Sequence, residues 1–213
     1  MIAPCVTAVD AAQYREQMAR IAPFATRIHI DVSDGQFAPI KLVNPAQVYW
    51  PEGASADIHL MVRNPIEHLE TLIGMNPNLV IIHAESQGDL LGMIRQLRAV
   101  RIKTGVALLQ QTLPEQAKEL VADCDHILIF SGDLGHFGGS ADLSLLSKIS
   151  QIKSINPNAE VAWDGGASLE NVAQLSGGGV DVINVGGAIQ KSEDPAGAYK
   201  ALVEASKVIA PQV

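Results

Sequence analysis

The chain has 213 residues, of which 47% are hydrophobic and 18% are charged, so it can bury a substantial core and is not expected to be disordered. Its formal net charge of -8 and pI near 5.1 argue against a nucleic-acid partner, because phosphate backbones attract clustered Lys and Arg. We expect no signal peptide and no membrane partner, since no basic segment precedes an apolar run and no run approaches ~18–20 residues.

Apolar, β-branched runs recur along the chain, and each is followed by a stretch with helical periodicity. Several runs are continuously apolar, as is typical of strands that are covered on both faces. The predicted strands are residues 2–6, 27–32, 56–62, 79–84, 104–109, 126–130, 160–164 and 181–185. The predicted helices are residues 11–21, 65–74, 88–100, 114–122, 143–155, 169–176 and 196–209.

Helix start signals agree with this reading. Asn64 precedes Pro65, which places a capping side chain before a proline at the first helical position, and Ser168 offers another N-cap. Only residues 34–55 lack a long helix, and there we expect a loop with a short helix at 46–49.

Strands that alternate with helices indicate an α/β protein with a parallel sheet. Closure into a single (β/α)₈ TIM barrel is favoured over an open Rossmann sheet, because no glycine fingerprint follows the first strand. We therefore predict one catalytic domain over residues 1–213, and a homo-oligomer is compatible with it. Cys5 and Cys124 fit neither a metal-binding spacing nor a disulfide framework, which indicates a reducing, cytoplasmic compartment.

Polar side chains interrupt the apolar strands at their carboxyl ends. His29 and Asp31 alternate with apolar residues and share one face of the second strand, and His59 has the same position on the third. Asp164 closes the seventh strand. In a (β/α)₈ barrel these strand ends converge on one rim, where active sites are built.

Each of these residues alone has a structural explanation, since a strand-end aspartate is more often a helix cap and a single histidine is more often packed in the core. The four together are harder to explain in that way. Two imidazoles and two carboxylates suit Zn²⁺, Fe²⁺ or Mn²⁺, so the set predicts one divalent metal ion bound by His29, Asp31, His59 and Asp164.

The second and seventh strands are three steps apart around the ring, so Asp31 and Asp164 can approach a central ligand from opposite sides. One carboxylate can then remove a proton next to a carbonyl, and the other can return one to the opposite face. A metal ion would stabilise the enediolate that forms between the two transfers.

Glycine pairs follow the last three strands, at Gly138-Gly139, Gly165-Gly166 and Gly186-Gly187. A single pair is usually only a turn. Three pairs on consecutive strands favour a phosphate site, because backbone N–H groups bind phosphate and glycine permits its close approach.

Several stretches resemble the ribulose-phosphate 3-epimerase family of the pentose phosphate pathway. They are Ile2-Ala3-Pro4, His29-Ile30-Asp31-Val32-Ser33-Asp34-Gly35, His59-Leu60-Met61, His83-Ala84-Glu85, Phe137-Gly138-Gly139, Asp164-Gly165-Gly166 and Gly186-Gly187-Ala188-Ile189. The resemblance covers nearly the whole chain. It implies the same four metal ligands, with Asp31 and Asp164 as the acid/base pair, in an epimerase that interconverts D-ribulose 5-phosphate and D-xylulose 5-phosphate at C3.

The residues and the resemblance together give a set of contacts to the sugar phosphate. For Cys5 and His136 a packing or loop role is the alternative to substrate contact. The predicted phosphate- and substrate-binding residues are Cys5, His59, Met61, His136, Phe137, Gly138, Gly139, Gly165, Gly166, Gly186 and Gly187.

The chain departs from the family pattern around the sugar carbons. The family usually has serine where Cys5 stands and methionine where Ser33 and Phe130 stand, and the loop at residues 131–136 replaces its Asn-Pro-Gly run. Two alternatives therefore stay open: an epimerase of another ketose phosphate, such as a hexulose 6-phosphate, or a non-catalytic sugar-phosphate-binding barrel. A lysine-dependent aldolase or decarboxylase is disfavoured, because Lys103 lies at the wrong end of its strand.

Overall fold

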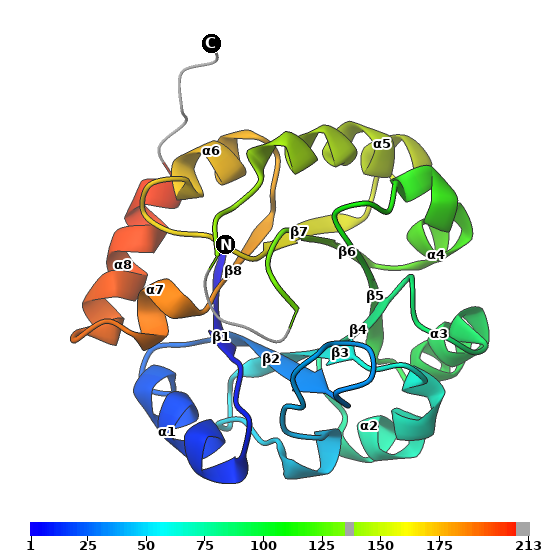
Figure 1. The fold of residues 1–213 in the computed structure, drawn as a ribbon, viewed down its shortest axis with the longest axis horizontal. Coiled ribbons are helices and arrows are strands. Elements are labelled where there is room, and N and C mark those ends of the chain that lie inside the picture. The colour runs from blue at the N-terminus through cyan, green and yellow to red at the C-terminus, as the bar shows by residue number, and fades with distance from the viewer. Residues whose placement is uncertain (135–138, 208–213) are drawn as a thin grey trace.

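The computed structural model describes residues 1–134 and 139–207 and shows a closed barrel inside a ring of helices (Figure 1). In these residues eight parallel strands pair in sequence order, and β1 closes the ring against β8. The strands are β1 (Ile2–Val6), β2 (Arg27–Ser33), β3 (Ser55–Met61), β4 (Leu79–His83), β5 (Lys103–Leu108), β6 (His126–Phe130), β7 (Glu160–Asp164) and β8 (Val182–Val185). The predicted α/β class and single (β/α)₈ TIM barrel are confirmed.

The helices follow the strands as predicted, with differences at their ends. They are α1 (Ala11–Ile21), α2 (Leu69–Met75), α3 (Leu90–Ala99), α4 (Lys118–Asp123), α5 (Lys148–Ile155), α6 (Val172–Gly177), α7 (Gly187–Gln190) and α8 (Pro195–Ser206). Residues 208 and 209, the predicted end of the last helix, lie outside the described residues. None of the helices in the described ranges has the length and apolar content needed to cross a membrane.

Three predicted helices begin at the expected residue, but with a different type of first turn. The segments Pro65–His68, Pro114–Ala117 and Leu143–Ser147 are 3₁₀ helices that lead into α2, α4 and α5, a frequent form of a first turn. Asn64 does not cap the first of them, because its amide donates a hydrogen bond to the Glu67 carboxylate instead. The short helix expected at 46–49 is a 3₁₀ helix at Pro45–Gln47.

Helix α1 shows how the outer ring is held in place. Tyr14, Met18 and Ile21 recur at helical spacing and are buried against the outside of the strands. The carboxylate of Asp10 accepts hydrogen bonds from the first turn and caps the helix.

The inside of the barrel is packed with apolar side chains over most of its depth. The residues of this inner cluster are Ala3, Leu79, Ile81, Ala107, Leu128, Ala162 and Val182. These apolar side chains fill the middle of the barrel. The inward-pointing polar side chains near the ends of the strands therefore gather at its carboxyl end.

The amino ends of the strands carry a separate polar cluster. Arg27, on β2, forms ion pairs with Asp57 at 2.5 Å and with Glu160, on β7, at 2.7 Å. Nδ1 of His126, on β6, lies 2.8 Å from a Glu160 oxygen. The cluster ties β2, β3, β6 and β7 together at the end opposite to the predicted site.

Glu160 is expected to make folding stability depend on acid pH. Burial raises the pKa of Glu160, but hydrogen bonds from His126 and Arg27 outweigh it and hold the pKa below its usual range. A carboxylate with a lowered pKa stabilises the fold above its unfolded pKa, about 4.3, and this contribution is lost as pH falls toward the folded pKa. Glu160→Gln should therefore lower the free energy of unfolding at pH 7, and the difference from wild type should shrink below about pH 4.

Urea unfolding at pH 7 and pH 3.5 measures this difference. With 38% of the Glu160 side chain exposed, solvent screening limits the loss at pH 7 to about 1 kcal/mol. Glu119→Gln, at an exposed position, is the matched control and should follow wild type at both pH values. Equal losses for Glu160→Gln at pH 7 and pH 3.5 would contradict the prediction.

Candidate metal centre and substrate pocket

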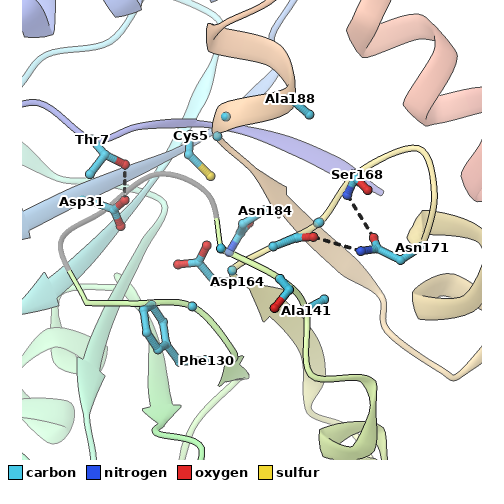
Figure 2. A pocket seen from close by; sticks show the side chains of 18 of the residues that line it. Cys5, Thr7, Asp31, Phe130, Ala141, Asp164, Ser168, Asn171, Asn184 and Ala188 are labelled. Carbon is cyan, nitrogen blue, oxygen red and sulfur yellow. Dashed lines mark hydrogen bonds between the residues drawn. The ribbon is translucent and has the colours of Figure 1, made fainter.

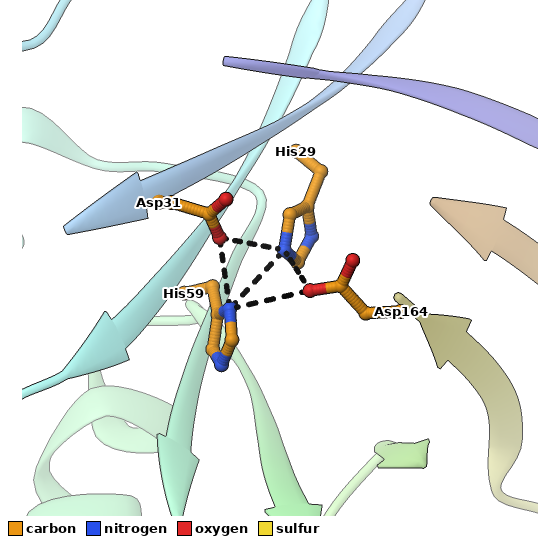
Figure 3. Close-up of side chains that lie close together, drawn as sticks. All are labelled: His29, Asp31, His59 and Asp164. Carbon is orange, nitrogen blue, oxygen red and sulfur yellow. Dashed lines mark hydrogen bonds and ion pairs between the residues drawn. The ribbon is translucent and has the colours of Figure 1, made fainter. Parts of the chain in front are cut away.

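Four side chains from three strands meet at the carboxyl end of the barrel (Figure 3). His29 and Asp31 alternate along β2 and point inward, and His59 pairs in register with Asp31 on β3. Asp164 ends β7. Both imidazoles are completely buried, and Asp31 is 7% exposed. The four residues predicted as metal ligands are therefore brought together.

The distances between these side chains suit a single metal ion. Nδ1 of His59 lies 2.9 Å from Oδ1 of Asp31 and 3.7 Å from Oδ2 of Asp164. Nε2 of His29 lies 3.2 Å and 3.5 Å from the same two oxygens. One ligand atom from each residue falls within 4.8 Å of all the others. Ligands about 2.1 Å from a tetrahedral ion lie about 3.4 Å apart, so the cluster fits one ion.

A chain of hydrogen bonds behind His59 sets which of its nitrogens is free. Nε2 of His59 lies 2.9 Å from Nε2 of His83, and Nδ1 of His83 lies 3.3 Å from the Glu85 carboxylate. Burial lowers the pKa of His83 to about 4, so this imidazole is neutral at pH 7. With Nδ1–H of His83 donating to Glu85, its Nε2 accepts from Nε2–H of His59. The lone pair of His59 Nδ1 is then left to face the two aspartates, an arrangement of acceptors that a cation stabilises.

The charged side chains of the cluster shift one another's pKa values. Burial lowers the pKa of His29, but hydrogen bonds with Asp164 and Asp31 outweigh it and raise the pKa to about 10. Burial raises the pKa of Asp31, yet the hydrogen bond and the charge of His29 hold it well below the usual range. Asp31 is therefore ionised at neutral pH, as a metal ligand must be.

Thr7 completes the surroundings of Asp31 and was not among the predicted residues. Its hydroxyl donates a 2.5 Å hydrogen bond to Oδ2 of Asp31, the oxygen that does not face the histidines. Backbone N–H and C=O of Thr7 both bond to the Gln17 side chain. Thr7 is thus fixed, and it holds the plane of the Asp31 carboxylate. The alternation of Ala3 and Cys5 on β1 with Thr7, one residue beyond the strand, was the available signal.

A pocket of about 420 Å³ opens beside the cluster (Figure 2). Asp31 and Asp164 line it directly, while His29 and His59 do not and are fully buried. The predicted residues that line it are Cys5, Asp31, Met61, Gly139, Asp164, Gly165, Gly166, Gly186 and Gly187. The predicted contacts His136, Phe137 and Gly138 lie outside the described residues. Lining residues that were not predicted as site residues include Thr7, Ser168, Asn171, Asn184 and Lys191.

The glycines after β7 have a packing role as well as a place in the pocket. Gly165 and Gly166 have φ values of 104° and 70°, which favour glycine. A Cβ on Gly165 would lie 2.1 Å from the nitrogen of Gly132, and one on Gly166 would lie 2.2 Å from the nitrogen of Ala141. The loop after β6 therefore packs directly on the loop after β7. After β8, Gly187 begins α7, a short helix that was not among the predicted ones.

The three departures from the family pattern have different surroundings. Cys5 lines the pocket at 2% exposure, and burial raises the pKa of its thiol, so it is uncharged. The Ser33 hydroxyl donates a 2.7 Å hydrogen bond to the carbonyl of Ile40 and so stabilises the loop that follows β2. The Phe130 ring lines the pocket, with its centroid 6.0 Å from that of His59.

Comparison with known sequences gives the family. Residues 1–190 match the sequence model of the Ribulose-phosphate 3 epimerase family. The chain belongs to this family. It is 29% identical to the ribulose-phosphate 3-epimerase of Helicobacter pylori strain J99, over 91% of this chain and 92% of that protein. It is 30% identical to the ribulose-phosphate 3-epimerase of Mycobacterium bovis, over 95% and 91%. Membership in the epimerase family places the chain among the isomerases that act on carbohydrates.

Among solved structures, this epimerase-family barrel is similar to 3-hexulose-6-phosphate synthase from Salmonella typhimurium, with a TM-score of 0.73. The two are 15% identical over 98% of this chain and 99% of that chain. At this level of identity the similarity shows the barrel fold alone.

Proposed function

We propose that the protein interconverts D-ribulose 5-phosphate and D-xylulose 5-phosphate by moving a proton at C3. One observation carries the proposal: Asp31 and Asp164, from β2 and β7, line the same pocket and meet around two buried histidines. The names of the curated relatives agree with this substrate.

In this proposal His29, Asp31, His59 and Asp164 hold one divalent ion, Zn²⁺, Fe²⁺ or Mn²⁺. Two nitrogens and two carboxylate oxygens accept each of these ions, and availability decides between them. When bound, the ion supplies positive charge beside the ketose oxygens and lowers the free energy of the enediolate.

The two aspartates carry the proton transfers. One carboxylate removes the C3 proton from one face of the substrate, and the other delivers a proton to the opposite face, which inverts C3. The hydroxyl of Thr7 holds one Asp31 oxygen, so the carboxylate keeps its orientation while it gains or loses a proton. Burial of the surrounding side chains limits exchange of the intermediate with water.

The phosphate of the substrate is assigned to the glycine end of the pocket. Gly165, Gly166, Gly186 and Gly187 line it without side chains, so the anion can approach backbone N–H groups. Lys191 lines the same pocket and adds a positive charge. His136, Phe137 and Gly138, which lie outside the described residues, stay proposed as substrate contacts. The free, buried thiols of Cys5 and Cys124 support a cytoplasmic location.

Incubation with ribulose 5-phosphate in D₂O tests the reaction directly. Because the proton returned to C3 comes from a carboxylate that exchanges with solvent, we expect deuterium at C3 of the xylulose 5-phosphate formed. Mass spectrometry and proton NMR of the two ketose phosphates measure it. Product without deuterium at C3 would contradict the two-carboxylate mechanism, and no product with bound substrate would favour a non-catalytic sugar-phosphate-binding barrel.

A second substrate has a specific observation in its favour. Cys5 and Phe130 change the pocket wall beside the reacting centre, which allows an epimerase of a longer ketose phosphate, such as a hexulose 6-phosphate. A panel of pentulose and hexulose phosphates ranked by kcat/KM separates the two. The highest value is expected for ribulose 5-phosphate.

A further inference from the structure

Asn184 is a buried amide in the pocket whose polar atoms have no partner among the described residues. It lies on β8, is 2% exposed and lines the pocket. Neither its Nδ2 nor its Oδ1 forms a hydrogen bond within residues 1–134 and 139–207. The other residues of β8 are Val182, Ile183 and Val185, so the amide is the single polar side chain of this strand.

The strand register places Asn184 beside the acid/base residue of β7. Asn184 pairs with Asp164, and Asp164 pairs with Phe130 on β6, so the three side chains are neighbours on the inner face of adjacent strands. Figure 2 shows the side chain of Asn184 next to that of Asp164. Two residues further along the chain, just after β8, Gly186 begins the part of the pocket assigned to phosphate. Asn184 therefore lies between the reacting centre and the phosphate end.

An unpaired amide at this depth is unfavourable for folding. A buried donor or acceptor without a partner costs free energy, and an apolar side chain of similar size would avoid that cost. An asparagine at this position therefore does not help the fold, but it can form hydrogen bonds with a bound ligand. The matching ligand group is a hydroxyl, because it can accept a hydrogen bond from Nδ2–H and donate one to Oδ1 at the same time.

We propose that Asn184 binds the substrate hydroxyl on the carbon between the reacting carbon and the phosphate, which is the C4 hydroxyl of a pentulose 5-phosphate. The inference rests on the proposed function and goes further, because it names a specificity residue and the group that it recognises. A site that pairs a buried amide with a hydroxyl rejects analogues that lack the hydroxyl, since the amide is then left unpaired.

Binding to compounds that cannot react tests the proposal. D-ribitol 5-phosphate, its 4-deoxy analogue and inorganic phosphate are titrated into the metal-loaded protein by calorimetry. For Asn184→Val we expect the Kd of ribitol 5-phosphate to rise about tenfold, while the Kd values of the 4-deoxy analogue and of phosphate stay within about twofold of wild type. Asn158→Val, at an exposed position, is the matched control and should bind all three like wild type.

Thermal unfolding of the ligand-free variants provides a second measurement. Because Val removes an unpaired buried amide and fits a strand, Asn184→Val should have a Tm at or above that of wild type. Asn184→Ala provides the same binding comparison with a smaller side chain. A lower Tm for the Val variant together with unchanged affinity for ribitol 5-phosphate would show a structural amide and overturn the proposal.

The two proposals fail in different ways in this experiment. If wild type does not bind ribitol 5-phosphate, the assignment of the pocket to pentose phosphates is wrong. If wild type binds it and the Val and Ala variants bind it equally well, the role of Asn184 is wrong and the proposed function stands. Equal loss of affinity for the 4-deoxy analogue would also overturn the role of Asn184, because the lost contact would then lie elsewhere.

Discussion

Replacement of Asp164 by asparagine is expected to lower kcat for ribulose 5-phosphate by about 10³-fold. The carboxylate of Asp164 ends β7, lines the pocket and faces Asp31 across the cluster, so it is placed to exchange a proton with one face of C3. An amide keeps the shape and one oxygen donor but cannot take up a proton at neutral pH. Steady-state kinetics in both directions of the reaction measure the loss.

Because Asp164 also belongs to the metal cluster, the two roles must be separated. Metal content of each preparation is measured beside its kinetics, and the rate is compared at equal occupancy. Asp10→Asn is the matched control, since Asp10 is exposed, does not line the pocket and caps α1, where asparagine caps equally well. An Asp164→Asn protein with full metal content and more than a tenth of wild-type kcat would exclude Asp164 as an acid/base residue.

Proton exchange without epimerisation gives a sharper readout of the same pair. If each aspartate serves one face of C3, Asp164→Asn should still exchange the C3 proton of one ketose phosphate with D₂O, through Asp31. Asp31→Asn should do so for the other ketose phosphate. Exchange of both substrates by one variant would mean that a single residue serves both faces.

The pattern of the sequence was sufficient to predict the barrel and its four central residues, because both follow from local periodicity. Apolar strands covered on both faces alternate with helices, and His29 and Asp31 occupy alternate positions on one strand. In a closed barrel of parallel strands the carboxyl ends meet at one rim, so Asp164 lies near His29 and Asp31 although it is far from them along the chain. The type of the first helical turn was not predicted, because the choice between a 3₁₀ and an α turn after Pro65 depends on packing.

Contacts across the barrel could not be predicted in the same way. The hydrogen bonds that link His59 to His83 and Glu85 depend on the radius of the barrel and on side-chain rotamers. Asn184 is different, because an asparagine inside Val182–Val185 is the same signal as His29 in β2, a polar residue within an apolar strand. Thr7 gave the same signal one step beyond β1. Applied to all eight strand ends, the rule would have found both residues.

Removal of the metal ion is expected to lower turnover by at least about 10²-fold, and one equivalent of Mn²⁺ or Zn²⁺ should restore it. Without the ion, negative charge that develops on the substrate oxygens would face Asp31 and Asp164 unshielded. Dialysis against a chelator, followed by readdition and elemental analysis, measures the effect. Full activity in a protein shown to be free of metal would contradict the prediction.

Metal affinity should rise with pH, because metal and proton compete for His29. In the metal-free protein, Asp164 and Asp31 raise the pKa of His29 to about 10, so this imidazole is charged at pH 7. An imidazole binds metal only in its neutral form, and each bound ion therefore displaces about one proton. The apparent Kd should fall about tenfold for each pH unit between about 6.5 and 8.5, and then level off above the pKa.

Competition with a chelator of known affinity at pH 6.5, 7.5 and 8.5, with a metal such as Mn²⁺ that stays soluble, measures this slope. His68, outside the cluster, offers the matched control. His68→Ala should keep both the affinity and its pH dependence, whereas His29→Ala should bind the ion more weakly and show a shallower slope, because the competing proton has been removed with the side chain. A slope in His29→Ala as steep as in wild type would assign the displaced proton to another group. The proton on His29, which the two aspartates stabilise in the metal-free protein, would then not be the one that the ion displaces.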